Sequence, residues 1–327
     1  AAHAGAKVWQ PYHLEWDHWT GAGALAAWAG ISRLAQVGMD LLCPSHGPVV
    51  AERPAEMLRV LMRRLMRFYE SKLSVCAGER DEFVPAEPIG FAAKRVLPHL
   101  YHFGANGYML LSDRGEALVA DATLPDLEAL DRLHGHLGRP RITAAIASHY
   151  HLDHCDGIPH LRRRHRTRAY LHPWVAALTE QPRLWDAPWL PLKPVRADEL
   201  LPERGAWRWN EYVFLVAPFP GQTWWHAAHQ ATIDGVKVFF GGDNFQPGSR
   251  WNGTGGYCAY NGSRFREGFV RSAQLVLDWR PDVLCNGHGT FFRFRRSRFR
   301  KIQRWALAAE RAVQALCPSG ELEKDYY

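Results

Sequence analysis

The sequence predicts an α/β fold, and the order of apolar and amphipathic segments in its middle third carries that prediction. An apolar run at 117–122 is followed by an amphipathic segment at Leu124–Leu137 and then by a second apolar run at 142–147. Strand, helix and strand in this order are typical of parallel strands in a packed α/β architecture. A later run, Val236–Phe240, has the same apolar character and indicates a further buried strand.

Length and composition are those of a water-soluble globular protein. The 327 residues are 47% hydrophobic and 22% charged, and no apolar run approaches the length of a membrane span. The six cysteines show no Cys-x-x-Cys spacing, so we do not expect a disulfide framework. Reduced thiols suit a cytoplasmic location, which we take as the expectation.

The net charge is +7, and a basic run at Arg293–Arg304 holds much of the excess. Basic residues interleaved with phenylalanine could bind nucleic acid or an acidic lipid surface. They could equally form the solvated face of a helix, with Phe294, Phe299 and Ile302 turned inward. We favour the helix, so nucleic acid is not an expected partner.

The N-terminal segment resembles the C-terminal end of the same chain. Asp40-Leu41-Leu42-Cys43-Pro44-Ser45-His46-Gly47 parallels Asp282-Val283-Leu284-Cys285-Asn286-Gly287-His288-Gly289, and each stretch lies between two helix-like segments. We interpret this as an internal repeat of helix, strand and helix. Residues 1–80 then form a partial unit and 81–327 the main domain, with the boundary in the polar, Pro- and Gly-containing stretch 76–90. His46 has no neighbouring co-ligand motif, so we predict a vestigial or structural role for it.

The main domain begins with a series of short strands. His99–Ser112 is expected to form two strands around a glycine turn, and Asp113-Arg114-Gly115 a hairpin turn. The strand at 117–122 contains Asp121 near its end. A carboxylate in that position is commonly a turn or helix cap.

The residues that carry chemistry follow the strand at 142–147. Ser148-His149-Tyr150-His151-Leu152-Asp153-His154 places three imidazoles and a carboxylate on a loop between a strand and a helix. In an extended chain His149 and His151 point the same way, which suits a metal such as zinc. Asp153 and His154 lie where the chain turns and can face a second ion. Two ions about 3.5–4 Å apart form a hydrolytic site.

The pattern His-x-His-x-Asp-His resembles the signature of the metallo-β-lactamase superfamily. That resemblance implies a four-layer αβ/βα sandwich, two metal ions and usually hydrolysis. It also implies a supporting role for Asp121, a bridging carboxylate at Asp243 of Gly242-Asp243, and a last imidazole at His288. The segment 1–80 in turn resembles the C-terminal part of a second copy.

One element departs from the family pattern. The family usually has Pro-Gly-His-Thr where this chain has Pro220-Gly221-Gln222-Thr223, and an amide is a poorer zinc ligand than an imidazole. We predict that His226 substitutes for the missing imidazole, with His229 as a further candidate. If neither reaches the site, the first ion is bound weakly or the chain is a non-catalytic member.

The resulting prediction is a metal-dependent hydrolase with two Zn²⁺ ions, iron or manganese being alternatives. The first ion is held by His149, His151 and His226, the second by Asp153, His154 and His288, and Asp243 lies between them. A hydroxide shared by the ions would attack an ester, thioester, lactone or related bond of a small-molecule substrate, with Asp153 as the catalytic residue that orients it.

Three other functions stay open, as does a homodimer. They are an iron-bearing oxidoreductase on the same fold, a nuclease or nucleic-acid-binding member, and a degenerate member. Two segments are candidates for substrate contact. The Trp- and Pro-rich stretch 169–207 either walls a substrate site or covers an edge of the core, and the loop 246–262 is expected to form a mobile rim.

Overall fold

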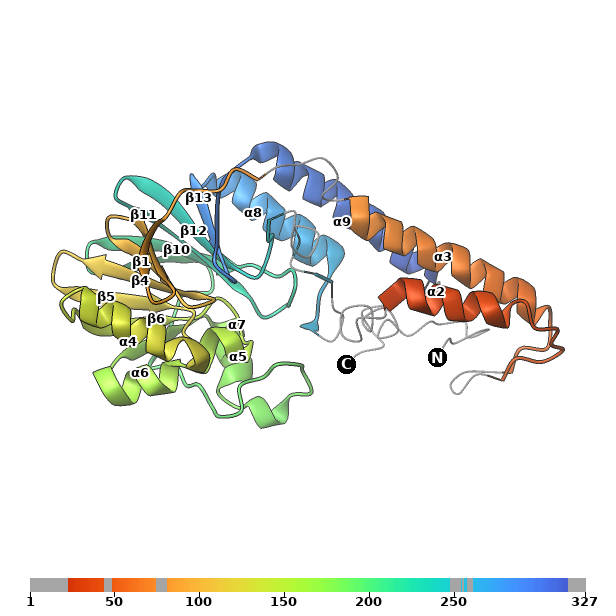
Figure 1. Ribbon diagram of the computed structural model, residues 1–327, viewed down its shortest axis with the longest axis horizontal. Helices are drawn as coiled ribbons and strands as arrows, with labels where there is room; N and C mark the ends of the chain where they lie inside the picture. The colour runs from red at the N-terminus through yellow and green to blue at the C-terminus, as the bar shows by residue number, and fades with distance from the viewer. Residues whose placement is uncertain are drawn as a thin grey trace.

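Two β-sheets lie face to face, and helices cover the outer face of each sheet, as Figure 1 shows. The computed structural model describes residues 23–43, 49–74, 81–247, 254, 256–257 and 261–316. None of the described helices is both long enough and apolar enough to cross a membrane. The layers confirm the four-layer αβ/βα sandwich that the sequence predicts.

The first sheet contains eight strands in chain order, antiparallel from β1 to β5 and parallel from β5 to β8. They are β1 (Glu87–Gly90), β2 (Ala93–Leu97), β3 (Leu100–Phe103), β4 (Gly107–Ser112), β5 (Glu116–Ala120), β6 (Arg141–Ile146), β7 (Arg168–Leu171) and β8 (Glu199–Leu200). The predicted turn at Asp113-Arg114-Gly115 joins β4 to β5, where Ser112 pairs with Glu116. The β5–helix–β6 crossover is also confirmed.

Short helices cover the outer face of the first sheet. They are a 3₁₀ turn η2 (Leu124–Asp126) leading into α4 (Leu127–His136), then α5 (Leu152–Cys155), α6 (Ile158–His165), α7 (Pro173–Thr179) and the 3₁₀ turn η3 (Pro182–Leu184). Met109 of β4 packs in this layer with Leu130 and Leu133 of α4.

The second sheet contains six strands in the order β14-β13-β12-β11-β10-β9. They are β9 (Gly205–Trp209), β10 (Tyr212–Pro218), β11 (Ala227–Ile233), β12 (Val236–Gly242), β13 (Val283–Asn286) and β14 (Thr290–Arg293). Only the β12–β13 pair is parallel. The site segments follow parallel strands in both sheets, and carboxyl ends of such strands are where ligands collect.

The core between the sheets is built by alternation along the strands. Tyr108 and Leu110 of β4 point into it, on the opposite side from Met109, because successive side chains of a strand face opposite ways. Tyr108 meets Phe240 of β12 edge-on, with ring centroids 5.6 Å apart. Each large side chain buried in this way contributes about 1.5–3 kcal/mol to folding.

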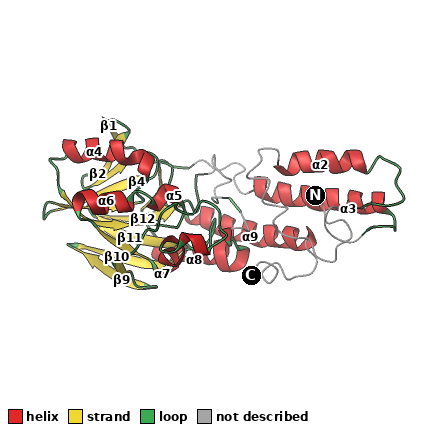
Figure 2. Ribbon diagram, turned by 90° about the horizontal axis from the view of Figure 1, so that it is seen from below, coloured by secondary structure: helices red, strands yellow, loops and turns green. Residues whose placement is uncertain are grey.

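A second helical layer covers the other sheet and extends beyond it. It consists of a π-helical turn η6 (Phe265–Val270), α8 (Arg271–Trp279), α9 (Arg296–Leu316), and an N-terminal pair α2 (Gly23–Leu34) and α3 (Pro54–Ser74). Figures 1 and 2 both show α2 and α3 projecting past the sheets alongside α9. Leu61, Leu65 and Phe68 of α3 share one apolar cluster with Phe299 and Ile302 of α9.

The N-terminal pair repeats the C-terminal helices in structure as well as in sequence. Helices α3 and α9 each contain 21 residues. Leu42 pairs with Val50 in antiparallel fashion, as Leu284 pairs with Phe292, and each helix begins the same number of residues after its pair. The turn that contains His46 and the predicted boundary near residue 80 fall partly outside the described residues, so the second-copy interpretation stays a prediction.

The environments of the two repeats differ. Val283 and Phe291 are buried in the second sheet at 3% and 6% exposure. Leu41 and Val49, in the corresponding places, are 57% and 59% exposed. The difference arises because β13 has β12 beside it, whereas the described residues provide no further strand beside Leu42.

Arg293 ends β14, and the rest of the basic run from Arg296 onwards forms the start of α9, as predicted. Phe299 and Ile302 are buried, and Phe294 is partly buried against the same cluster. Arg298 is an exception to the solvated face that the sequence predicts, because only 5% of it is exposed. Its guanidinium pairs with Asp81, donates to the backbone oxygen of Gln246 and lies 4.7 Å over the ring of Phe292. This cation holds the start of α9 against the second sheet.

We expect the Phe299→Ala substitution to lower the free energy of unfolding by about 3–5 kcal/mol, because it leaves a cavity where α9 meets the second sheet. Phe299 is fully buried and contacts Phe245 at 5.5 Å between ring centroids. Urea denaturation measures the change. Arg300→Ala, one residue away on the exposed side of α9, should change stability by about 0.5 kcal/mol or less. Equal effects in the two variants would contradict this packing.

Candidate metal centre

The predicted metal-binding side chains come from both sheets and meet at one edge of the sandwich. Three segments follow the carboxyl ends of parallel strands, and one follows β10. They are 147–154 after β6, Asp243 after β12, Gly287 and His288 after β13, and the loop 219–226 after β10. The strand-to-helix loop and the β10–β11 loop are joined by an antiparallel bridge between His149 and His226.

Two groups of three side chains have the spacing of metal ligands. His149, His151 and Asp243 each offer one ligand atom, and these atoms lie within 4.8 Å of one another. Asp153, His154 and His288 form a second group with the same spacing. Of the seven residues predicted from the sequence, six are therefore brought together in these two groups.

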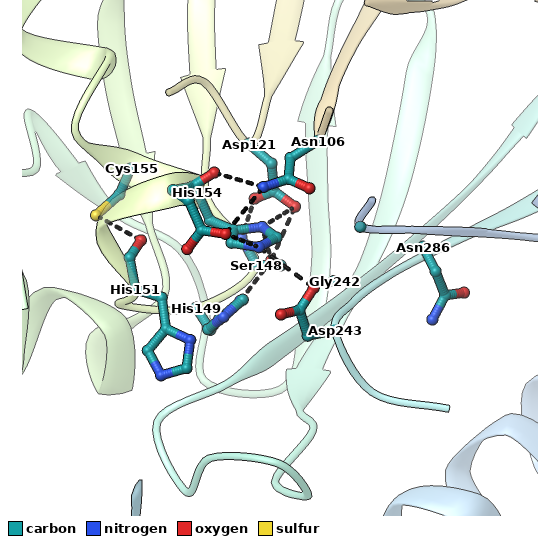
Figure 3. Close-up of polar contacts among 12 residues, drawn as sticks. Asn106, Asp121, Ser148, His149, His151, His154, Cys155, Gly242, Asp243 and Asn286 are labelled. Atoms are coloured by element: carbon teal, nitrogen blue, oxygen red, sulfur yellow. Dashed lines mark hydrogen bonds and ion pairs between the residues drawn. The ribbon is translucent and has the colours of Figure 1, made fainter. Parts of the chain in front are cut away.

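Asp243 connects the groups, and Figure 3 shows its carboxylate beside His149 and joined to His154. Its Oδ1 lies 3.3 Å from His154 Nε2 and 3.3 Å from His288 Nε2. The carboxylate is 2% exposed, so these imidazoles are its main source of compensating charge. It thus belongs to one group and contacts two histidines of the other, and its role as a bridge between two ions stays a prediction.

Burial and neighbouring charges set the protonation of the cluster. Burial lowers the pKa of His151 to about 4, and burial with the neighbouring imidazoles holds the pKa of His149 well below its usual value. Burial also opposes a charged His154, but Asp243, Asp153 and Asp121 outweigh it and raise the pKa of His154. In turn, His154 and His288 overcome the effect of burial on Asp243 and keep its pKa well below the usual value.

Asp121 supports the cluster, in agreement with the role that the resemblance implies. Its carboxylate accepts hydrogen bonds from Ser148 N at 2.6 Å and Ser148 Oγ at 2.8 Å, and it lies 3.2 Å from His154 Nδ1. This contact leaves His154 Nε2 facing Asp243. A carboxylate behind a ligating imidazole fixes its ring orientation and tautomer. Asp121 adopts a left-handed backbone, φ +54°, to reach these partners.

Asn106 is a supporting residue that the sequence reasoning missed. Its Nδ2 donates to the backbone oxygen of Asp153 at 2.8 Å and to Asp153 Oδ2 at 3.2 Å. Its Oδ1 accepts from the backbone N–H of His288 at 2.6 Å, where φ is +57°. One amide thereby ties together two ligand segments that are distant in sequence. A polar residue in the turn between two buried strands was the only signal for it.

Gln222 stands where the family usually has a histidine, and its side-chain amide lies within the centre. Gln222 Nε2 donates to Asp243 Oδ2 at 3.2 Å, and Asn244 Oδ1 accepts from the Gln222 backbone N–H at 2.7 Å. His226, the predicted substitute ligand, is in neither group of three. Its fully buried ring stacks on His149, with centroids 4.8 Å and planes 8° apart. His229 lies on β11 opposite Phe240, also outside both groups.

Two glycines make this close approach of backbone and side chains feasible. A Cβ on Gly242 would lie 2.4 Å from Ser148 Oγ and 2.6 Å from His226 Nε2. A Cβ on Gly287 would lie 2.3 Å from Asp243 Oδ1. Both positions therefore exclude larger residues, in keeping with the sequence motifs Gly242-Asp243 and Gly287-His288.

Comparison with known families identifies the arrangement. The family model described as "Metallo-beta-lactamase superfamily" matches residues 101–288, a span that begins in β3 and ends on the last ligand candidate. The chain belongs to the metallo-β-lactamase superfamily. The resemblance found in the His-x-His-x-Asp-His motif is thus confirmed over more than half of the sequence.

Solved structures of metallo-β-lactamases share its fold. A Cronobacter sakazakii metallo-β-lactamase with a HARLDQ motif is similar with a TM-score of 0.55 and 17% identity, covering 71% of this chain and 96% of that one. The subclass B3 enzyme BJP-1 of Bradyrhizobium japonicum has a TM-score of 0.50 and 15% identity, covering 68% and 92%. No curated protein matches the chain. At sequence identities this low, the similarity shows a shared fold and nothing about the reaction.

The donor atoms of this superfamily member fit metal ions. His149 Nε2 and His151 Nε2 are buried and have no hydrogen-bond partner within the part of the chain that the structure describes. His154 Nε2 and Asp243 Oδ1 likewise have no hydrogen-bond partner among the described residues, and they make ion-pair contacts with each other and with Asp153 and His288, respectively. A buried polar atom without a hydrogen bond costs about 1–3 kcal/mol, so bound cations would relieve several such penalties at once.

We expect Gly242→Ala to destabilise the metal-free protein by more than about 1–2 kcal/mol, since φ is +47° there and the new methyl group would strike Ser148 and His226. Gly241→Ala is the matched control. Its Cβ would lie 3.3 Å from the nearest atom, a Phe239 ring carbon, and φ is not in the left-handed region. Chemical denaturation with a chelator present compares them. A smaller loss in Gly242→Ala than in Gly241→Ala would refute the close packing.

Proposed function

We propose that the chain is a metal-dependent hydrolase with a two-ion centre that cleaves an ester, thioester, lactone or related bond in a small-molecule substrate. The observation that supports it most is the convergence of two ligand groups on the single carboxylate of Asp243. Membership of a superfamily rich in hydrolases supports the reaction class.

The two groups would hold the two ions. His149 and His151 would bind the first with Asp243, and Asp153, His154 and His288 the second. A mixture of imidazole and carboxylate ligands favours zinc, and iron and manganese accept the same donors. Bound ions of this kind lower the pKa of a coordinated water and polarise the bond under attack.

Asp153 is placed to accept a hydrogen bond from the attacking water. Its side chain is 39% exposed, whereas that of Asp243 is 3% exposed, so Asp153 is the carboxylate that solvent and substrate can reach. Asn106 fixes one carboxylate oxygen by its 3.2 Å hydrogen bond. We assign to Asp153 the role of accepting a hydrogen bond from the attacking water and orienting it.

We expect His151→Ala to lose one of the two bound ions and essentially all hydrolysis, because it removes a buried first-ion ligand. Elemental analysis of the purified protein and turnover of a panel of ester, thioester, lactone and phosphodiester substrates measure the two effects. His136→Ala, at an exposed histidine on α4 outside the centre, should keep both ions and wild-type turnover. Full activity in His151→Ala would refute the ligand assignment.

The same elemental analysis decides between the hydrolase and its strongest rival. Zinc with turnover of the panel supports the hydrolase. Iron with redox-active optical spectra and no hydrolysis would favour an oxidoreductase on the same fold.

The residue that completes the first ion's ligands can be found with two variants. We expect Gln222→His to tighten zinc binding by about tenfold or more, since an imidazole would replace an amide beside Asp243. The stacked position of His226 favours retention of both ions in His226→Ala. Competition with a chromogenic chelator measures both affinities. Loss of one ion in His226→Ala would instead identify His226 as the ligand, as the sequence predicts.

A further inference from the structure

Five tryptophans gather on the side of the centre where His151 lies, and all five are partly exposed. Three come from the segment that follows β7, namely Trp174, Trp185 and Trp189. Two come from the β10–β11 loop, Trp224 and Trp225. We call these five residues the tryptophan cluster. The sequence leaves open whether the first three wall a substrate site or cover an edge of the core.

Contacts between the two segments join four of the five tryptophans in two pairs. Trp174 stacks on Trp224, with ring centroids 5.3 Å and planes 15° apart. Trp185 meets Trp225 edge-on at 5.7 Å. The β10–β11 loop that supplies the second member of each pair also supplies Gln222, so the aromatic surface and the centre share one loop.

Trp189 brings the cluster to the metal ligands. Its ring lies 4.9 Å from that of His151. Its backbone oxygen accepts a hydrogen bond from Leu152 N at 2.8 Å, which anchors the segment to the strand-to-helix loop. The backbone of Trp189 is left-handed, φ +57°, which is a strained conformation for a non-glycine residue. Such strain is retained where the surroundings hold the side chain in one place.

Exposure favours a substrate-facing role for part of the segment. Trp209, which packs in the core between the sheets, is 6% exposed. Trp185 is 38% exposed and its neighbour Leu184 is 73% exposed. A partly exposed aromatic surface is typical of a site that receives an apolar group.

A neighbouring positive charge limits which substrates the tryptophan cluster can bind. Arg264 lies over the ring of Trp224 at 4.6 Å, so a cation already occupies one aromatic face. An apolar or anionic substrate therefore suits this surface better than a cationic one.

We propose that the tryptophan cluster binds the apolar tail of the substrate, so that the centre acts on esters, thioesters or lactones of medium-length alkyl or aryl acids. The inference rests on the proposed hydrolase function for its reaction, but the cluster binds the tail by itself. The head of the substrate faces the centre, and the tail lies against Trp189, Trp185 and Trp225.

The test uses straight-chain carboxylates, the acids that such a hydrolysis would release, on the zinc-loaded full chain. Acetate, butanoate, hexanoate and octanoate share one head group, so differences in their affinity measure the tail alone. Calorimetry should show affinity rising with chain length, by up to about fourfold for each methylene that becomes buried. A flat series would overturn the proposal.

Variants locate the tail. Trp185→Ala and Trp189→Ala should each reduce the gain from acetate to octanoate by about tenfold, and in Trp185→Ala acetate binding should stay within about twofold of wild type. Trp207→Ala is the control, because Trp207 is also partly exposed but packs on β9 against Tyr170 and Phe214. An unchanged gain in both cluster variants would overturn the proposal, and zinc content establishes that each variant is folded.

The two proposals fail differently. If the chain is not a metal hydrolase, acetate binds no more tightly with zinc than without it, yet affinity still rises with chain length. If the cluster does not bind the tail, acetate still depends on zinc and the series is flat.

Discussion

The buried carboxylate of Asp243 is the constraint on which the centre depends. A charge at 2% exposure is tolerated only when cations or hydrogen-bond donors surround it, and His154, His288 and Gln222 do so here. Those partners come from three separate segments. The fold therefore has to bring the ends of β6, β12 and β13 and the loop after β10 to one point, and the two face-to-face sheets accomplish this.

Much of the centre could be predicted from sequence because its signals are local. The spacing of His149, His151 and His154 behind a buried strand specifies which way the side chains point, and Gly242 and Gly287 mark places where the backbone must come close. The repeat of α3 and α9 was visible for the same reason, since it lies in consecutive residues. Helix and strand positions followed from apolar periodicity, which local sequence also contains.

The residues that sequence reasoning missed act through contacts between distant segments. Asn106 joins Asp153 to His288, and no spacing in the sequence links those three. Arg298 reads as part of a solvated basic run, yet it is buried because Asp81 and the Gln246 carbonyl compensate its charge. The choice between Gln222 and His226 is likewise decided by which side chain the loop turns towards Asp243, a matter of three-dimensional packing.

The left-handed backbone at Asp121 and His288 ties function to a thermodynamic penalty. Glycine would adopt these torsion angles without strain, but it has no carboxylate to hold Ser148 and no imidazole to face Asp243. Substitutions to glycine that raise thermal stability at these two positions would therefore remove side chains of the centre. Glycine at either position would relieve the backbone strain and remove these contacts, so the stability of the chain and the geometry of the centre oppose each other at these two residues.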